Sequence, residues 1–191
     1  MKTVLIGSLM VFLVGFLTAR SAKAEGSGEA TIGRALVAYF SLSGNSKTIA
    51  LETYRLIGGD LFEIQTVKPY PERYNDQTDQ AKIEQREQAR PALKTHVADM
   101  GQYDLIVLVY PNWWSSIPMP VATFLEEYDL TGKTILPICS HGGGGLQGVR
   151  AITKSAPKAK VLTGLGIAAA GGRNLTGDLT AYLTKLGLTA Q

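Results

Sequence analysis

The sequence is poor in the residues that build disulfides and metal centres. Among its 191 residues it has one cysteine and two histidines. A single cysteine excludes an internal disulfide, so the fold must depend on its hydrophobic core. Cys139 ends an apolar run, and we expect a small buried residue there rather than a reactive thiol. His96 and His141 are far apart in the chain and no cysteine pair accompanies them, so we expect no metal site.

The sequence also lacks an excess of charge once its first residues are set aside. The formal net charge is +3, but residues 1–24 contain three basic residues and no acidic one. The remaining 16 basic and 16 acidic residues cancel, so we expect no nucleic-acid partner. This neutrality is uneven, with a net charge of −6 over residues 25–132 and of +6 over residues 133–191. The basic half is either a solvated face or a surface that steers a partner.

Residues 1–24 have the pattern of a secretory signal peptide. Lys2 gives a short basic start, residues 4–17 are apolar and uncharged, and residues 22–24 place alanines at the two positions that a signal peptidase reads. We expect cleavage after Ala24, release into the periplasm or the medium, and no membrane span in the processed chain. The alternative is an uncleaved anchor, although the apolar run is at the short limit of the roughly 17 to 25 residues that span a bilayer.

One α/β domain is expected over residues 34–191, preceded by a flexible Gly-rich leader at 25–33. Continuous apolar runs suit strands that helices cover on both faces, and their alternation with amphipathic helices predicts a parallel sheet between two helical layers. The expected strands are 35–40, 61–67, 103–110, 134–139 and 160–165, and the expected helices are 46–57, 120–128 and 175–186. Residues 68–100 are polar, with a helix candidate at 72–88, and we expect most of them at the surface.

The first candidate site is residues 41–46 (SLSGNS), between the first expected strand and helix. Hydroxyl groups and the free N–H groups at a helix start suit a phosphate. The spacing in this loop is neither GxGxxG nor GxxxxGK[ST], which argues against a dinucleotide-binding domain and an ATPase. The alternative is structural, with Ser43 or Asn45 capping the helix and Gly44 easing the turn.

The second candidate site is residues 110–118 (YPNWWSSIP), which hold both tryptophans of the chain. Two adjacent tryptophans cannot easily face the same way. We expect one in the core and the other on the surface of a cleft, where it can stack on a flat ligand.

The third candidate site is residues 140–145 (SHGGGG), after the fourth expected strand. Four glycines in a row are unfavourable unless the backbone approaches something closely or adopts positive φ. A serine hydrolase is not expected, because no GxSxG elbow is present and Ser140 has no evident base.

These three loops all follow strands, so a parallel sheet brings them to one edge. With strand order 2-1-3-4-5, the order reverses between the first and third strands, which is where open α/β sheets bind ligands. The three loops then surround one crevice, and the predicted ligand carries a phosphate and a planar ring.

The run at 39–50 (YFSLSGNSKTIA) resembles the loop of flavodoxins that binds the FMN phosphate, and residues 110–145 are similar to the flavin-flanking region of flavodoxin-like proteins. The likeness covers residues 34–186. It implies a flavodoxin-like three-layer sandwich with a five-stranded parallel sheet and bound FMN. The residues implied are Ser41, Ser43, Gly44, Asn45 and Ser46 around the phosphate, Pro111, Asn112, Trp113 and Trp114 along the ring, and Ser140, His141, Gly142 and Gly143 on its other side.

Three departures from electron-carrying flavodoxins affect the functional interpretation. His141 stands where such proteins usually have an aromatic residue, which leaves the ring more open to a substrate. We expect the processed chain to be neutral and exported, whereas such flavodoxins are acidic and cytoplasmic. The fifth strand lacks the roughly twenty-residue interruption of long-chain flavodoxins, and the chain is enlarged between the second and third strands instead.

The resemblance implies an FMN-dependent redox protein, and the signal-like residues 1–24 imply a location outside the cytoplasm. It is either an electron carrier with a redox partner protein or a reductase of a quinone or another small-molecule acceptor. His141 is the candidate catalytic residue, because histidine is suited to exchange a proton near neutral pH and thereby stabilise reduced flavin. The alternative is a non-catalytic binding protein that keeps this fold and binds another ligand.

Overall fold

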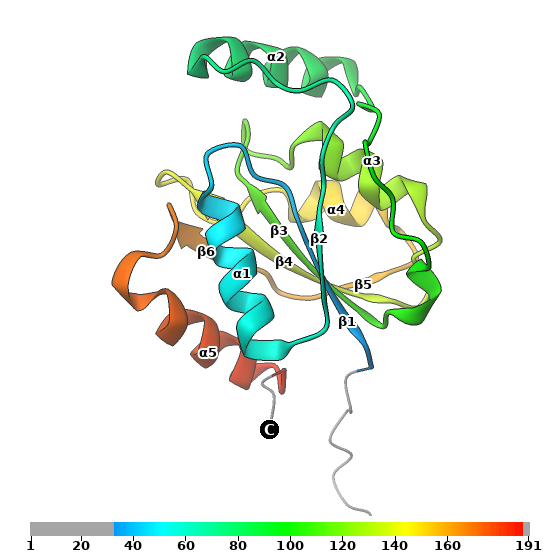
Figure 1. Cartoon of the computed structure of the whole chain (residues 1–191), viewed down its shortest axis with the longest axis vertical. Coiled ribbons are helices and arrows are strands. Elements are labelled where there is room, and N and C mark those ends of the chain that lie inside the picture. Colours follow the sequence, from blue (N-terminus) through cyan, green and yellow to red (C-terminus); the bar gives the residue numbers. More distant parts are fainter. Residues whose placement is uncertain (1–32, 189–191) are drawn as a thin grey trace, which may run out of the picture.

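The computed structural model describes residues 33–188 as a sheet between two helical layers (Figure 1). The strands are β1 (Ala35–Tyr39), β2 (Asp60–Glu63), β3 (Leu105–Pro111), β4 (Thr134–His141), β5 (Lys160–Val161) and β6 (Leu165–Ala168). The helices are α1 (Asn45–Ile57), α2 (Tyr74–Glu87), α3 (Met119–Glu127), α4 (Val149–Ser155) and α5 (Leu175–Lys185), with 3₁₀ turns at Met100–Gln102 and Gly172–Asn174. The expected signal peptide and residues 25–32 of the expected leader lie outside the described residues.

The sheet is parallel and its order is β2-β1-β3-β4-β5, with β6 also paired to β4. This confirms the predicted fold class and strand order. Expected strand bounds were wrong at the start of the third strand, which begins at Leu105, and at the ends of the second and fourth strands. The second strand ends at Glu63, because residues 65–67 leave the sheet to pair with residues 92–94. The fourth strand continues through Ser140 and His141, which were expected in the following loop.

The fifth strand position is filled by two short strands, and Pro137 of β4 explains the interruption. Ile135 pairs with Val161 and Ile138 with Leu165, so the outer strand has one residue more than β4 over this stretch. The Ile135 carbonyl accepts a hydrogen bond from the Leu162 N–H at 2.9 Å. Alternate residues of a strand face the same neighbour, so Pro137 also faces the outer strand, and it has no N–H to donate. A bulge at this point is the expected result.

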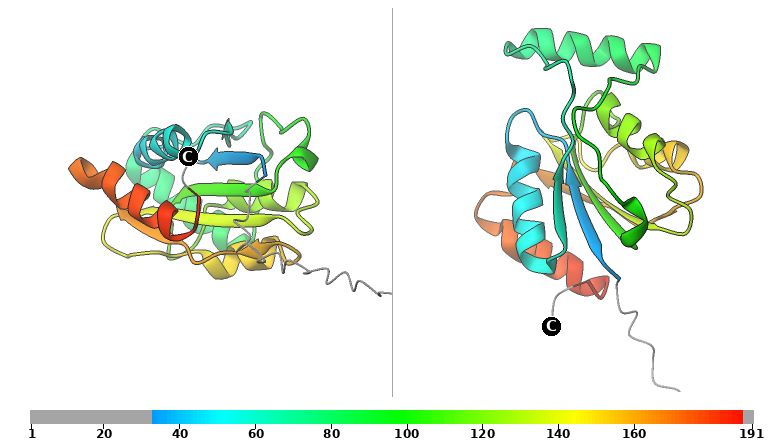
Figure 2. Two further views of the ribbon diagram at one scale, coloured as in Figure 1. Left: turned by 90° about the horizontal axis from the view of Figure 1, so that it is seen from below. Right: turned by 45° about the vertical axis from the view of Figure 1, so that its right-hand side comes forward.

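Helices cover both faces of the sheet, as Figure 2 shows. In β1, Leu36 and Ala38 pack into the core beneath α3 and α4, whereas Val37 and Tyr39 pack toward α1 and α5. All five β1 residues are buried, which is why the strand reads as an unbroken apolar run. The predicted three-layer arrangement is confirmed.

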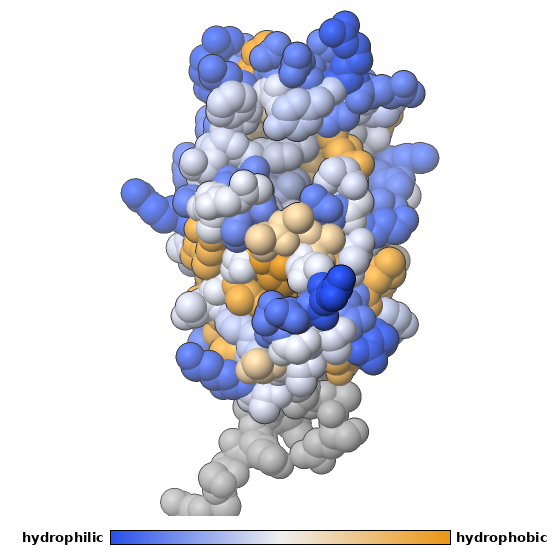
Figure 3. All heavy atoms as spheres, turned by 90° about the vertical axis from the view of Figure 1, so that its left-hand side faces the viewer, coloured by the Kyte–Doolittle hydropathy of each residue, from blue (hydrophilic) through white to orange (hydrophobic). Residues whose placement is uncertain are grey.

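Helix α2 belongs to neither layer and stands beyond the carboxyl edge of the sheet (Figure 1). The segments that lead to it and from it form a two-stranded ribbon, in which Val67 N–H donates to the Ala92 carbonyl at 2.9 Å and Lys94 N–H to the Gln65 carbonyl at 2.8 Å. The top of the molecule, which α2 forms, is mostly hydrophilic in Figure 3. Over residues 33–188, none of the helices is long and apolar enough to cross a membrane.

Candidate functional site

A cavity of about 610 Å³ lies at the carboxyl edge of the sheet and receives residues from all three predicted loops. The convergence of these loops on one space therefore follows the sequence prediction. The predicted residues that line it are Ser43, Asn45, Pro111, Asn112, Trp113, Trp114, Ser140, His141 and Gly142. Ser41, Gly44, Ser46 and Gly143 lie beside these residues in the chain but do not line the cavity.

The first loop is shaped by bonds within it. The Ser41 hydroxyl accepts a hydrogen bond from the Gly44 N–H at 3.1 Å, and Gly44 has a φ of 89° where α1 begins. This conformation is readily available to glycine and rare for other residues. The residue at the N-cap position is Gly44, which has no side chain, so the structural alternative of a Ser43 or Asn45 cap is not what the structure shows. The first N–H groups of a helix have no partner within it and remain donors for an anion.

Two buried hydroxyl groups join the first and third loops. The Ser46 and Ser140 oxygens lie 2.8 Å apart, and the two residues are 1% and 4% exposed. Ser46 is therefore directed at β4 rather than at the cavity. This bond holds the first turn of α1 against the end of β4, and thereby fixes the distance between the two loops. Sequence inspection offered no signal for it, because both serines were assigned to a ligand.

The second loop is a tight turn that separates the two tryptophans. Trp113 and Ser116 exchange both backbone N–H···O bonds, at 3.1 and 3.0 Å. Trp114 and Ser115 between them have φ angles of 50° and 59°, which is the type I′ geometry usually taken by Asn-Gly. Each such residue costs roughly 1–2 kcal/mol when it is not glycine. The turn that directs Trp114 outward therefore carries backbone strain at Trp114 and Ser115.

The two tryptophans both line the cavity, and only Trp113 packs against the core, where it is partly buried. Trp113 packs edge-on against Phe40 and Tyr70, with ring centroids 5.4 and 5.3 Å away. Trp114 is half exposed and contacts α2 instead. Its indole N–H donates to the Thr78 carbonyl at 3.0 Å, and the Lys82 ammonium lies 4.9 Å from its ring centroid.

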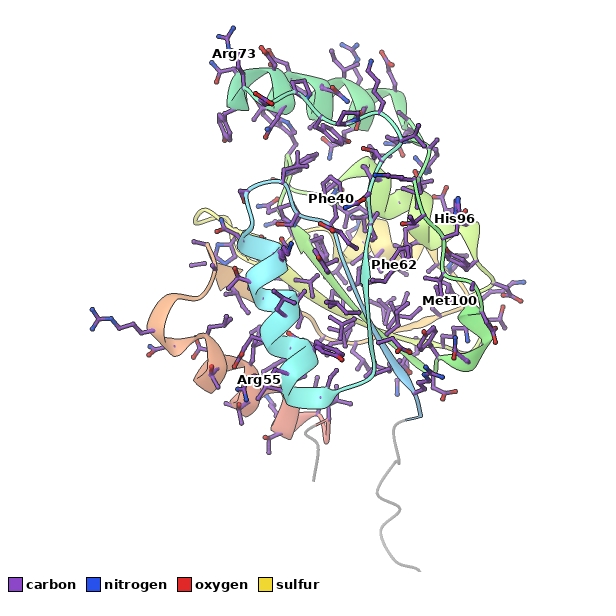
Figure 4. The ribbon with its side chains drawn as sticks, viewed as in Figure 1. Phe40, Arg55, Phe62, Arg73, His96 and Met100 are labelled. Atoms are coloured by element: carbon purple, nitrogen blue, oxygen red, sulfur yellow. The ribbon has the colours of Figure 1, made fainter. Side chains whose placement is uncertain are left out.

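The third loop begins where β4 ends. The His141 Nδ1 accepts a hydrogen bond from the Gly143 N–H at 3.1 Å, so the hydrogen of the neutral ring lies on Nε2. A Cβ atom at Gly142 or Gly143 would meet no heavy atom within 4 Å, so the backbone of this loop borders open space. His96, by contrast, contacts the Glu127 carboxylate at the end of α3 (Figure 4). The two histidines are in separate environments.

Cys139 lies directly before this loop and is fully buried, as predicted. Burial raises the pKa of its thiol. The residue is part of the core beneath the site. No group of three or more His, Cys, Asp or Glu side chains that could hold a metal ion occurs among the residues described.

One wall of the cavity was not predicted. It comes from α2, which we expected to be surface only, and from Ala169 after β6. The α2 residues in this wall are Tyr74, Gln77, Thr78 and Ala81. Their spacing of three, four and seven residues is that of one helix face. This spacing is visible in the sequence, but only the structure shows that this face of α2 is turned toward the cavity.

The residues of the cavity fit the FMN expected from the sequence. A volume of about 610 Å³ is within the range of roughly 300–1,000 Å³ that is usual for ligand pockets. The start of α1 suits the phosphate, and the tryptophans and glycines border the space for a flat ring. Asn112 Oδ1 is buried with no hydrogen-bond partner among the described residues, which leaves an acceptor to be satisfied at the site.

Comparison with known proteins agrees with this geometry. The chain is similar to a candidate flavoprotein from Bacteroides eggerthii, with 28% identity over 82% of this chain and 99% of that one and a TM-score of 0.73. A candidate flavoprotein from Bacteroides uniformis is 26% identical over 78% and 98% of the two chains, with a TM-score of 0.70. A flavoprotein from Lactobacillus acidophilus, solved in complex with FMN, shares the fold at 19% identity, over 72% and 93%, with a TM-score of 0.61.

A comparison with curated proteins finds no match. The flavodoxin family profile, however, matches residues 34–182, which is most of the chain and contains all three loops. The chain therefore belongs to the flavodoxin family.

Proposed function

We propose that this chain is an FMN-dependent redox protein that works outside the cytoplasm. The observation that carries the proposal is the cavity, where a loop suited to phosphate and two loops suited to a flat ring meet. Family membership supports FMN as the ligand. When bound, FMN supplies reversible transfer of electrons, and the protein sets its potential and access. The location rests on the signal-like residues 1–24.

The acceptor is a small molecule in this proposal, rather than a partner protein. The supporting observation is the position of α2, whose residues form one wall of the cavity. This wall leaves less room for a protein partner to reach the cofactor than for a small molecule. The opposite charges of the two halves of the chain are the feature that would favour a protein partner.

The first prediction concerns the cofactor itself. The chain recovered from a periplasmic fraction is expected to begin at Glu25 and to bind one FMN with a dissociation constant below about 1 μM, which corresponds to roughly −8 kcal/mol. Intact mass spectrometry identifies the first residue. An FMN titration followed by flavin fluorescence measures the stoichiometry and the dissociation constant. Riboflavin, which lacks the phosphate, is the control and should bind at least about tenfold more weakly, since a charge-assisted phosphate contact is worth roughly 1.5–3 kcal/mol.

A colourless protein that takes up no added FMN would contradict the proposal. It would favour the alternative of a binding protein that uses the same cavity for another ligand. Equal affinity for FMN and riboflavin would remove the phosphate role from the loop at 41–46.

The second prediction concerns His141. His141 lines the cavity and would stabilise the negative charge that reduction places on the cofactor. His141→Gln is therefore expected to lower the flavin midpoint potential and to change its dependence on pH. Potentiometric titration across pH 5 to 9 measures this. His96→Gln is the matched control, because His96 contacts Glu127 instead. Identical pH profiles for wild type and His141→Gln would exclude the role.

A further inference from the structure

Helix α2 presents a single face to the cavity. Tyr74, Gln77, Thr78 and Ala81 line it, and Ala81 is the one buried residue among those of α2. The rest of the helix is polar apart from Ile83, which is itself exposed, so α2 has no apolar face that would pack it onto the sheet.

Specific polar contacts, rather than apolar burial, hold α2 in place. The indole N–H of Trp114 donates a hydrogen bond to the Thr78 carbonyl, and the side-chain amide of Gln85 donates one to the Trp114 carbonyl at 3.3 Å. From the incoming segment, the Tyr70 hydroxyl donates to Glu84 at 2.5 Å. Burial and this carboxylate raise the pKa of Tyr70, so its hydroxyl stays a donor. These contacts fix the helix face at the cavity.

Within the described part of the chain, residues 33–188, the walls of the cavity contain no carboxylate, ammonium or guanidinium group. Among the fourteen residues that line it, Tyr74 and His141 have the only ionisable side chains. A charged ligand would leave water here without meeting an opposite charge, which is costly. The start of α1 serves the cofactor phosphate, so a second molecule that enters the cavity should be uncharged.

Tyr74 is an aromatic ring that lines the cavity without being packed. Its residue is 76% exposed, and the aromatic pairs of the described residues do not include it. An unpacked phenol ring at a cavity is available to stack on a flat molecule. The hydroxyl and amide groups of its helix neighbours supply polar contacts beside it.

We propose that Tyr74, Gln77 and Thr78 form the wall that selects the electron acceptor, and that this acceptor is a small, uncharged, planar quinone that stacks on Tyr74. The inference rests on the proposed redox function and assigns its substrate class. A quinone takes two electrons and two protons from the reduced cofactor and leaves as the hydroquinone. In the assay below, dithionite supplies the electrons that reduce the cofactor beforehand.

The test uses the FMN-loaded chain, reduced with stoichiometric dithionite and mixed anaerobically with 1,4-benzoquinone in a stopped-flow instrument. Tyr74→Ala is expected to raise the half-saturating concentration of benzoquinone roughly 2- to 12-fold, the range that corresponds to one aromatic contact. The limiting rate, the dissociation constant of FMN and the rate with ferricyanide should not change. Tyr74→Phe keeps the ring and should behave as wild type. Tyr54→Ala, which removes an exposed tyrosine from α1, is the matched control.

Each other outcome overturns a defined part of the inference. Weaker FMN binding in Tyr74→Ala with unchanged benzoquinone saturation would place the ring on the cofactor and not on the acceptor. Unchanged values for both would remove Tyr74 from the site. Faster oxidation of the wild type by cytochrome c than by benzoquinone would show a protein acceptor. Failure of the wild type to bind FMN would overturn the proposed function itself, which is a separate measurement.

Discussion

Phe40→Ala is expected to lower the free energy of unfolding by about 3–5 kcal/mol, the usual range for deleting a buried phenyl ring. Phe40 is 2% exposed and packs edge-on against Tyr70 and Trp113, with ring centroids 5.9 and 5.4 Å away. Figure 4 shows it inside the molecule below α2. Chemical denaturation followed by tryptophan fluorescence measures the loss.

The same substitution should weaken FMN binding about tenfold or more, because the three rings join the first loop, the second loop and α2. Phe40 precedes the loop at 41–46, Trp113 belongs to the second loop, and Tyr70 anchors α2. Loss of 1.4 kcal/mol of this preorganisation corresponds to a factor of ten in affinity.

Phe124→Ala is the control for this prediction. Phe124 is 0% exposed, belongs to α3 and packs on Phe62 and Tyr128, away from the cavity. It should lose similar stability and keep its FMN affinity. Phe40→Leu retains most of the volume and guards against a variant that does not fold. Equal FMN affinity in Phe40→Ala and Phe124→Ala would show that the aromatic cluster supports the fold but not the site.

The sheet could be predicted because its strands are buried on both faces. Residues 35–40 and 105–110 read as unbroken apolar runs, and a chain that alternates such runs with helices has few arrangements other than a parallel sheet. The break between β5 and β6 could not be predicted in the same way. Pro137 is visible in the sequence, but its effect depends on which neighbour it faces, and only the register of β4 decides that.

The three loops of the site were predictable for a related reason. They follow strands, and the carboxyl ends of parallel strands meet at one edge. The wall from α2 depends on long-range pairing instead. The pairing of Thr66 with Leu93 places α2 beyond the edge of the sheet. No local sequence pattern near Tyr74 predicts this pairing. The Ser46–Ser140 bond was missed because a serine in a loop gives no indication of which way its hydroxyl points.

Gly148→Ala is expected to lower the free energy of unfolding by about 2–5 kcal/mol. Gly148 has a φ of 87°, which costs another residue roughly 1–2 kcal/mol. Its added Cβ would also lie 2.7 Å from Ile117 Cγ2 and 3.0 Å from the Ile117 backbone nitrogen, and relief of such overpacking adds about 1–3 kcal/mol. The change would press on the segment that follows the tryptophan turn, so FMN affinity should fall together with stability.

Gly132→Ala separates the two causes. Gly132 has a φ of 75°, but a Cβ there would meet no heavy atom within 4 Å, and the residue lies at the turn before β4, far from the cavity. It should lose only the conformational part, about 1–2 kcal/mol, with FMN affinity unchanged. The difference between the two variants in denaturant unfolding then measures the contact with Ile117. If both variants lose the same free energy of unfolding, the second loop moves away from the added methyl group at no cost. Glycine is then required at position 148 by its backbone conformation alone.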